Sequence, residues 1–203
     1  MAAFTFNQAN GTDLEDISPL WAGDVPDLLE VQSSKLQQLG GNAFSSRAAY
    51  LNEAGSTYAI ARFSAGLSNE YNIIIHSSDG TISNGYYCKL STTSGIVYRN
   101  GGFETSFTIP GGVNVNSSNV EVRLERVGGT ISIYAGPVGS TSLGATFSDG
   151  SPISGGFSGF SFSGGGTTDP GVISFDNGVA ATTIYEFQSF SRGIGRGIAR
   201  GIA

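Results

Sequence analysis

The sequence is poor in the residues that build covalent and metal-bound sites. Cys88 is the single cysteine and His76 the single histidine of the 203 residues. One cysteine excludes an intrachain disulfide, and one histidine excludes a cluster of histidines around a metal ion. A Ser-His-Asp relay would have to use His76, and no Gly-x-Ser-x-Gly turn accompanies it. We therefore expect His76 to be a structural hydrogen-bonding group and Cys88 to be a buried, inert thiol.

Long apolar runs are also missing. No run approaches the length needed to cross a bilayer, and the first residues have neither the basic nor the apolar region of a signal peptide. We expect a protein that is made in a cytoplasm and has no membrane partner.

Charged residues are scarce, at 13% of the chain, and unevenly distributed. Three of the ten basic residues lie in the last twelve positions, which leaves seven basic against sixteen acidic residues, a net charge of −9, in residues 1–191. Binding to phosphates requires a positive surface. The acidic body therefore argues against nucleic acid as a partner.

Glycine, by contrast, is abundant, with 31 residues spread along the chain. Because glycine adopts positive φ without steric cost, this indicates many tight turns between many short strands. The clearest hairpin spans residues 120–134, where apolar residues alternate with charged ones on either side of a Gly-Gly turn. It predicts two sets of side chains: a buried set, Val120, Val122, Leu124, Ile131 and Ile133, and an exposed set, Glu121, Arg123 and Glu125.

The first forty residues give a weaker signal. Residues 13–30 carry six acidic residues, no basic ones and two prolines, which predicts a surface loop anchored by Trp21. Residues 27–39 fit either a helix, with Asp27 as N-cap and Gly40 as a stop, or two short strands.

The order of these elements resembles the concanavalin A-like lectin/glucanase family, which includes laminin-G-like domains. Three stretches carry the resemblance: the Phe-rich strand, turn and acidic loop from residue 6, the hairpin 120–134, and the aromatic-rich segments from 156 to 190. The resemblance implies an all-β fold, an antiparallel two-sheet jelly-roll sandwich whose first and last strands are adjacent. It also favours strands for residues 27–39. We assign residues 1–191 to this sandwich and residues 192–203 to a separate tail.

Glycosidases of this family carry their catalytic carboxylates on one strand, as Glu-x-Asp-x-x-Glu. Retaining hydrolysis needs two carboxyl groups roughly 5 Å apart. The nearest run here, residues 121–125, lacks the central aspartate and has Arg123 between its acids. We expect a solvated sheet face with ion pairs and no enzymatic activity, and a glycoside hydrolase with an atypical acid pair is the least favoured alternative.

Three turns contain aspartate, at Asp79, Asp149 and Asp176. Lectins of this family often bind calcium with such loops, but Asp-Gly and Asn-Gly are also the residues that hairpin turns require. We expect no cofactor, with calcium as the alternative.

Exposed aromatic rings stack on sugars through their apolar faces. Tyr86 and Tyr87 are adjacent in a predicted strand and so face opposite sides, which leaves at most one of them exposed. The candidate glycan-binding residues are Trp21, Tyr86, Tyr98 and Tyr134.

The tail repeats Arg-Gly-Ile-Gly/Ala three times. In an extended strand, this period places arginine and isoleucine on one face and only glycine and alanine on the other. Such a ribbon fits an acidic, apolar groove on another chain. The predicted partner-docking residues are Arg192, Ile194, Arg196, Ile198, Arg200 and Ile202.

A sandwich without a catalytic site that ends in a docking tail indicates a component of a larger assembly. The resemblance extends to concanavalin A-like domains of tailed-phage particles. We therefore predict a non-enzymatic virion structural protein, either a capsid decoration or a tail-associated subunit, made in the host cytoplasm. Its partners would be other virion proteins or copies of itself, with host-surface glycan as a further partner. The alternative is a carbohydrate-binding, lectin-like module.

Overall fold

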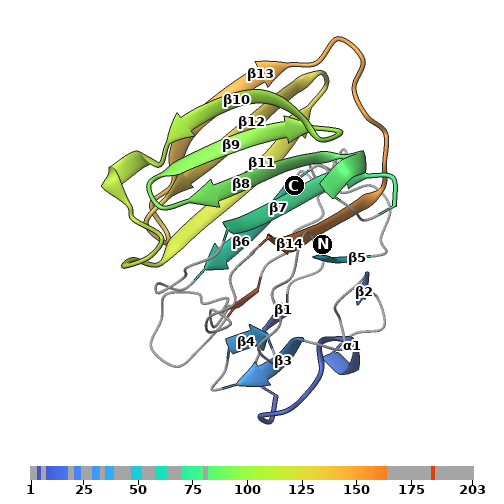
Figure 1. Ribbon diagram of the computed structural model, residues 1–203, viewed down its shortest axis with the longest axis vertical. Helices are drawn as coiled ribbons and strands as arrows, with labels where there is room; N and C mark the ends of the chain where they lie inside the picture. The colour runs from blue at the N-terminus through green and yellow to red at the C-terminus, as the bar shows by residue number, and fades with distance from the viewer. Residues whose placement is uncertain are drawn as a thin grey trace, which may run out of the picture.

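Two antiparallel β-sheets pack face to face and enclose the core (Figure 1). The computed structural model describes residues 4–5, 8–17, 21–23, 29–32, 35–38, 47–51, 58–63, 70–79, 82–163 and 184–185. Within these residues the elements are almost all strands, so the predicted all-β, two-sheet jelly-roll class is confirmed.

The larger sheet has seven strands. In spatial order these are β10 (Gly102–Thr108), β9 (Ser94–Arg99), β8 (Tyr86–Ser91), β7 (Glu70–Ser77), β14 (Phe157–Ser163), β5 (Arg47–Leu51) and β2 (Trp21–Gly23).

The smaller sheet has four strands. In spatial order these are β13 (Ser142–Ser148), β12 (Thr130–Gly136), β11 (Val120–Val127) and β6 (Tyr58–Phe63). The edge strands β10 and β13 lie against each other at one end of the sandwich.

Two short strand pairs complete the described fold. The hairpin of β3 (Leu29–Gln32) and β4 (Lys35–Gln38) confirms the strand interpretation of residues 27–39. The pair of β1 (Phe4–Thr5) and β15 (Ile184–Tyr185) confirms that the first and last strands are adjacent.

The surface loop predicted for residues 13–30 needs a correction. It contains the short helix α1 (Leu14–Ile17) and the strand β2, which pairs with β5. The acidic composition of this segment predicted a surface loop, but Leu14 is fully buried and anchors the segment to the core. Two 3₁₀ turns, η2 (Ile82–Asn84) and η3 (Pro110–Gly112), lie in other connections. No described helix has the length and apolar character needed to span a membrane.

The hairpin of β11 and β12 supplies the centre of the core. All five side chains predicted to be buried there are fully buried, because the period of two turns them toward the larger sheet. The prediction that Glu121, Arg123 and Glu125 point freely into water is wrong. Glu121 is only 9% exposed, and the other two side chains are partly covered. The reason is that Glu121 pairs with Arg62, and Arg123 lies over the Tyr134 ring and pairs with Glu125.

Candidate functional site

A β-bulge in β10 turns Phe103 to the outer face of the larger sheet. Phe107, four residues later, points into the core opposite Gly95 and is 8% exposed. In a regular strand, residues four apart share one face. The pairing shifts between Phe103 and Thr105, however, so Glu104 is an extra residue and Phe103 lies opposite Tyr98 instead. The bulge thus re-aims an aromatic side chain that would otherwise face the core, and leaves it 63% exposed.

Phe103 belongs to a row of side chains that crosses four strands. Ile74, Tyr87, Tyr98 and Phe103 lie opposite one another on β7, β8, β9 and β10, and we call them the outer row. The Tyr87 and Tyr98 rings are stacked, with centroids 4.6 Å apart and planes at 8°. The Phe103 ring stands at 87° to Tyr98 with a centroid distance of 6.5 Å. The two tyrosines therefore support each other, and Phe103 is the ring that is open to solvent.

The predicted glycan-binding residues fall in different parts of the fold. Tyr98 lies in the outer row. Tyr86 is fully buried on the core side of β8, so its expected exposure is wrong: the alternation along the strand gives the outer position to Tyr87. Tyr134 lies on the outer face of the smaller sheet, where the Arg123 guanidinium covers its ring at 4.0 Å from the centroid. For Trp21 the structure describes only the backbone, in β2.

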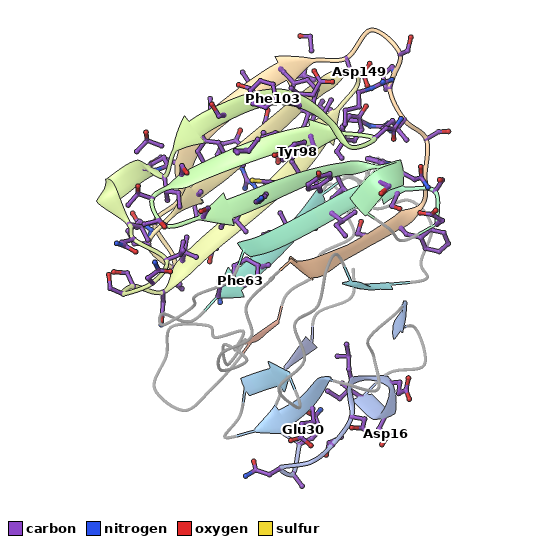
Figure 2. All side chains as sticks on the ribbon, in the orientation of Figure 1. Asp16, Glu30, Phe63, Tyr98, Phe103 and Asp149 are labelled. Atoms are coloured by element: carbon purple, nitrogen blue, oxygen red, sulfur yellow. The ribbon has the colours of Figure 1, made fainter. Side chains whose placement is uncertain are left out.

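A pocket of about 310 Å³ lies on the core side of the larger sheet, where Arg99 is paired with Tyr86. Tyr98 is followed directly by Arg99, and Phe103 by Glu104, so the β9–β10 hairpin contributes to both features. Figure 2 shows Phe103, Tyr98 and Asp149 at the same end of the sandwich. The lining residues are Arg99, Glu104, Phe147, Ser148, Asp149, Gly150 and Ser151.

Asp149 is the centre of a hydrogen-bond network at the pocket. Its Oδ2 accepts hydrogen bonds from the Tyr86 hydroxyl and from Arg99 Nε, both at 2.5 Å, and its Oδ1 accepts one from the Ser151 amide at 2.8 Å. Burial acts to raise the pKa of Asp149, but these hydrogen bonds and the Arg99 charge outweigh it and hold the pKa below its usual value. Burial, together with the hydrogen bond to Asp149, raises the pKa of Tyr86. Asp149 is therefore a fixed carboxylate with structural partners.

The segment that follows, residues 149–155, links β13 to β14 and is held by side chains from the sandwich. The Tyr86 hydroxyl accepts a hydrogen bond from the Ile153 amide at 3.0 Å, and Arg126 donates to the Ile153 carbonyl. Arg99 donates to the Ser151 carbonyl at 2.8 Å. These bonds fix the floor of the pocket to three strands.

His76 is held at the end of the same segment. It is 4% exposed, and its Nδ1 donates to the Gly155 carbonyl at 2.9 Å. Burial and the nearby Arg126 charge lower its pKa to about 4, so the ring is neutral at pH 7. Its Nε2 is buried and has no hydrogen-bond partner among the described residues. This is the structural histidine that the sequence predicts, in contact with the edge of Tyr86.

The acidic strand 121–125 forms ion pairs. Arg62 Nε donates to Glu121 Oε2 at 2.6 Å, and Arg123 Nε lies 3.4 Å from Glu125 Oε2. Both acids are on the outer face of the smaller sheet, away from the outer row and the pocket.

The aspartate turns give no cation site in the described part of the chain. Asp79 is hydrogen bonded by Asn84 Nδ2 at 2.5 Å and by Ser77, and Asp149 is bound by Arg99. No group of three or more potential metal ligands occurs among the described residues. Asp176 and the tail residues 192–203 lie outside them. Cys88 is fully buried, and burial raises the pKa of its thiol far above the usual range.

Phe103 and Glu104 are the residues that sequence reasoning missed. In a regular strand side chains alternate with a period of two, which predicts Phe103 and Phe107 on the same face. Only the Gly101–Gly102 turn just before Phe103 marks a place where the ladder can be interrupted.

Comparison of the whole structure with solved structures identifies the fold. A β-glucanase from Bacillus licheniformis superposes with a TM-score of 0.59 at 12% identity, over 91% of this chain and 98% of the other. The calcium-bound exoplasmic domain of VIP36 gives a TM-score of 0.56 at 8% identity, over 90% and 92%. Lectin II from Ulex europaeus gives 0.52 at 11% identity, over 91% and 99%. The sequence matches no protein-family model and no curated protein.

These structures share the jelly-roll sandwich of concanavalin A-like lectins and glucanases, which confirms the predicted fold. They include both hydrolases and lectins. None of them bears on the virion role or localisation predicted from the sequence.

Proposed function

We propose that this protein is a lectin-like module that binds carbohydrate without cleaving it, on the outer face of the larger sheet. The observation that carries the proposal is Phe103, a large aromatic side chain that is 63% exposed on a rigid sheet. Contiguous exposed apolar patches mark interaction sites on proteins, and Phe103 in contact with Tyr98 forms a continuous aromatic surface.

The outer row has the properties of a sugar-binding platform. A sugar ring has an apolar face of C–H groups that packs on an aromatic ring, and it has hydroxyl groups around its rim that need polar partners. Phe103 offers the ring. Tyr98 contacts it edge-on at 6.5 Å between centroids, and Tyr87 in turn stacks on Tyr98 at 4.6 Å. Because the platform is already ordered, little side-chain entropy is lost on binding.

The known activities of similar structures support the same class of ligand. One of these structures is a β-glucanase and another is a lectin, and the superposition covers more than nine-tenths of each of their chains. At 12% and 11% identity these likenesses concern the fold. The choice of carbohydrate for this chain rests on them together with the outer row.

The absence of cleavage is part of the proposal. Glycoside hydrolysis needs two carboxyl groups about 5–10 Å apart that are free to exchange protons and face the substrate. Glu121 is tied to Arg62 and nearly buried, on the sheet opposite the outer row. Asp149 is bound by Tyr86 and Arg99. The pKa of Asp149 is thereby held below its usual value, which keeps it ionised and is unfavourable for a general acid.

The test is a binding screen with a matched pair of variants. Calorimetric titration of the protein against soluble β-glucans and other polysaccharides is expected to give dissociation constants on the order of micromolar to millimolar. Phe103→Ala should abolish the heat signal. Leu143→Ala removes a side chain with similar exposure, 52%, from the outer face of the smaller sheet, and should bind as the wild type does. Absence of binding to every glycan, or equal loss in both variants, would refute the proposal.

Attachment to a virion or other large assembly through residues 192–203 stays a prediction. The proposed glycan surface is compatible with it, since the surface lies on described residues of the body and the tail is a separate segment of sequence.

A further inference from the structure

The pocket at the end of the sandwich has an excess negative charge among its lining residues. Arg99 and Asp149 form an ion pair of 2.5 Å, so their charges cancel. Glu104 also lines the pocket, is exposed, and forms no ion pair within the part of the chain that the structure describes. One positive and two negative side chains leave a net charge of −1, which favours a cationic ligand over an anionic one.

The other groups of the pocket suit the cationic side chain of an arginine. Phe147 contributes an aromatic ring, whose face attracts a guanidinium group. Ser148 and Ser151 contribute hydroxyl oxygens that accept hydrogen bonds. The volume of about 310 Å³ lies at the lower end of the range for small-molecule sites, which fits one long side chain. Arginine fits best, because its planar guanidinium can donate twice to a carboxylate such as Glu104 and stack on a ring.

The floor of the pocket is already ordered. The Ser151 amide donates to Asp149 at 2.8 Å, and the Ser151 carbonyl accepts from Arg99 at 2.8 Å. A Cβ added to Gly150, between Asp149 and Ser151, would meet open space. An entering side chain therefore meets a surface that needs no rearrangement, which lowers the entropy cost of binding.

An exposed apolar side chain lies a short distance from the pocket. Val127, at the end of β11, is 55% exposed. It lies opposite Thr130 on β12, and Thr130 lies opposite Ser148 of the pocket lining on β13. Since neighbouring strands are about 4.8 Å apart, Val127 and Ser148 are separated by roughly 10 Å. A ligand with an apolar group at this distance from its cation can contact both.

Residues 192–203, which lie outside the described residues, have this combination in their sequence. Each of their three arginines is followed two positions later by an isoleucine, with only a glycine between them. In an extended chain, residues two apart lie about 7 Å from each other on the same side, and their side chains add further reach. The segment has three basic and no acidic residues, opposite in sign to the rest of the chain.

We propose that an arginine of residues 192–203 of one copy enters the Glu104 pocket of a second copy, with the isoleucine two positions later on Val127. A second copy is favoured because β15, the last described strand, pairs with β1, and β1 lies far from Asp149 along the long axis of the molecule (Figures 1 and 2). This contact is independent of the proposed glycan surface, since the pocket and the outer row are on opposite faces of the larger sheet.

The first measurement is sedimentation velocity of the full-length chain across micromolar to millimolar concentrations. The wild type is expected to self-associate in this range, because the contact is small. Glu104→Arg, which reverses the charge of the pocket wall, should weaken self-association about tenfold or more, as should alanine at Arg192, Arg196 and Arg200 together. Glu15→Arg makes the same charge change at an exposed acid in α1 and should self-associate as the wild type does.

Mixing the two defective variants tests the contact itself. Glu104→Arg retains the arginines of residues 192–203, and the triple alanine variant retains the pocket. Neither should self-associate alone, but an equimolar mixture should form a heterodimer, because each variant supplies the half that the other lacks. Val127→Ala, added to the triple alanine variant, should weaken this heterodimer about threefold or more.

The contradicting results are equally definite. A wild type that stays monomeric at every concentration, self-association that persists in Glu104→Arg, or a mixture without heterodimers would overturn the proposal. Loss of self-association in Glu15→Arg would show that net charge, and not the pocket, is responsible. A heterodimer unaffected by Val127→Ala would overturn the isoleucine contact. Heterodimers that form only in the mixture support docking of residues 192–203 in the pocket of a second copy.

Discussion

Phe103 lies directly opposite Tyr98 across the β9–β10 pair, with the two rings nearly perpendicular and their centroids 6.5 Å apart. The bulge at Glu104 makes this pairing possible, since without it Phe103 would share the core-facing side of Phe107. Bulges are common beside functional sites because they redirect one side chain without disturbing the rest of the sheet. Here the bulge adds an exposed ring at the edge of a face that already carries a stacked tyrosine pair.

Stability should fall as the pH is lowered from 7 to 4, because of His76. In the folded state the ring stays neutral down to its pKa of about 4, whereas in the unfolded chain it takes up a proton near the ordinary histidine pKa of 6.5. The unfolded state thus binds more protons between pH 7 and pH 4, and the free energy of unfolding falls by roughly 3 kcal/mol over this interval. Urea denaturation at pH 4, 5, 6 and 7 measures the loss.

His76→Asn is the control for this pH dependence. Asparagine tolerates the positive φ of 53° at this position, so the backbone is kept while the titrating ring is removed. The variant should be less stable at pH 7 but should lose less stability between pH 7 and 4. An unchanged slope would show that other groups cause the acid sensitivity.

Gly155→Ala should destabilise the protein by about 2 kcal/mol or more. A Cβ at this position would clash with the His76 carbonyl and the Ser77 backbone. Neither group can move without disrupting the pairing of β7 with β14. Gly150→Ala, in the same segment, meets open space and should leave the melting temperature within a degree or two of the wild type. Equal melting temperatures for the two variants would contradict the packing described here.

No hydrolysis of β-glucans is expected, and Glu121→Gln should not change glycan binding. It should lower stability modestly, by about 1 kcal/mol, because it weakens the partly buried pair with Arg62. Release of reducing sugars measures hydrolysis, and calorimetric titration measures glycan binding by Glu121→Gln. A hydrolytic activity that disappeared in Glu121→Gln or Glu125→Gln would show that the protein is an enzyme.

The tail gives a prediction that is independent of the glycan surface. Deleting residues 192–203 should leave the melting temperature of the sandwich nearly unchanged and abolish incorporation into a larger assembly. Replacing Arg192, Arg196 and Arg200 by alanine should weaken attachment, and the wild-type attachment should weaken with added salt. Occupancy of full-length and truncated chains in purified particles is the measurement. Normal occupancy of the truncated chain would make the tail a passive terminus.

The sequence predicts those parts of the fold that depend on local alternation. The hairpin 120–134 and its buried side chains follow from a period of two, and the family resemblance correctly favoured strands at β3 and β4. Exposure of Glu121 could not be predicted, because Arg62, which covers it, lies 59 residues earlier and on another strand.

The candidate site depends on register, which the sequence does not specify by itself. Tyr98 was a candidate from its residue type alone. The outer row exists because Tyr87, Tyr98 and Phe103 are opposite one another on three strands, and one of these pairings follows a bulge. The network at Asp149 likewise joins residues from β8 and β9 to the segment after β13, a contact over 50 or more residues.

The most direct test of the central claim is calorimetric titration of wild-type protein and Phe103→Ala with one soluble β-glucan oligosaccharide, with Leu143→Ala as the control. The wild type and Leu143→Ala should bind with the same micromolar-to-millimolar affinity, and Phe103→Ala should show no binding at the same concentrations, with an unchanged melting temperature. Binding by Phe103→Ala with wild-type affinity would contradict the assignment of the outer row as the carbohydrate-binding surface.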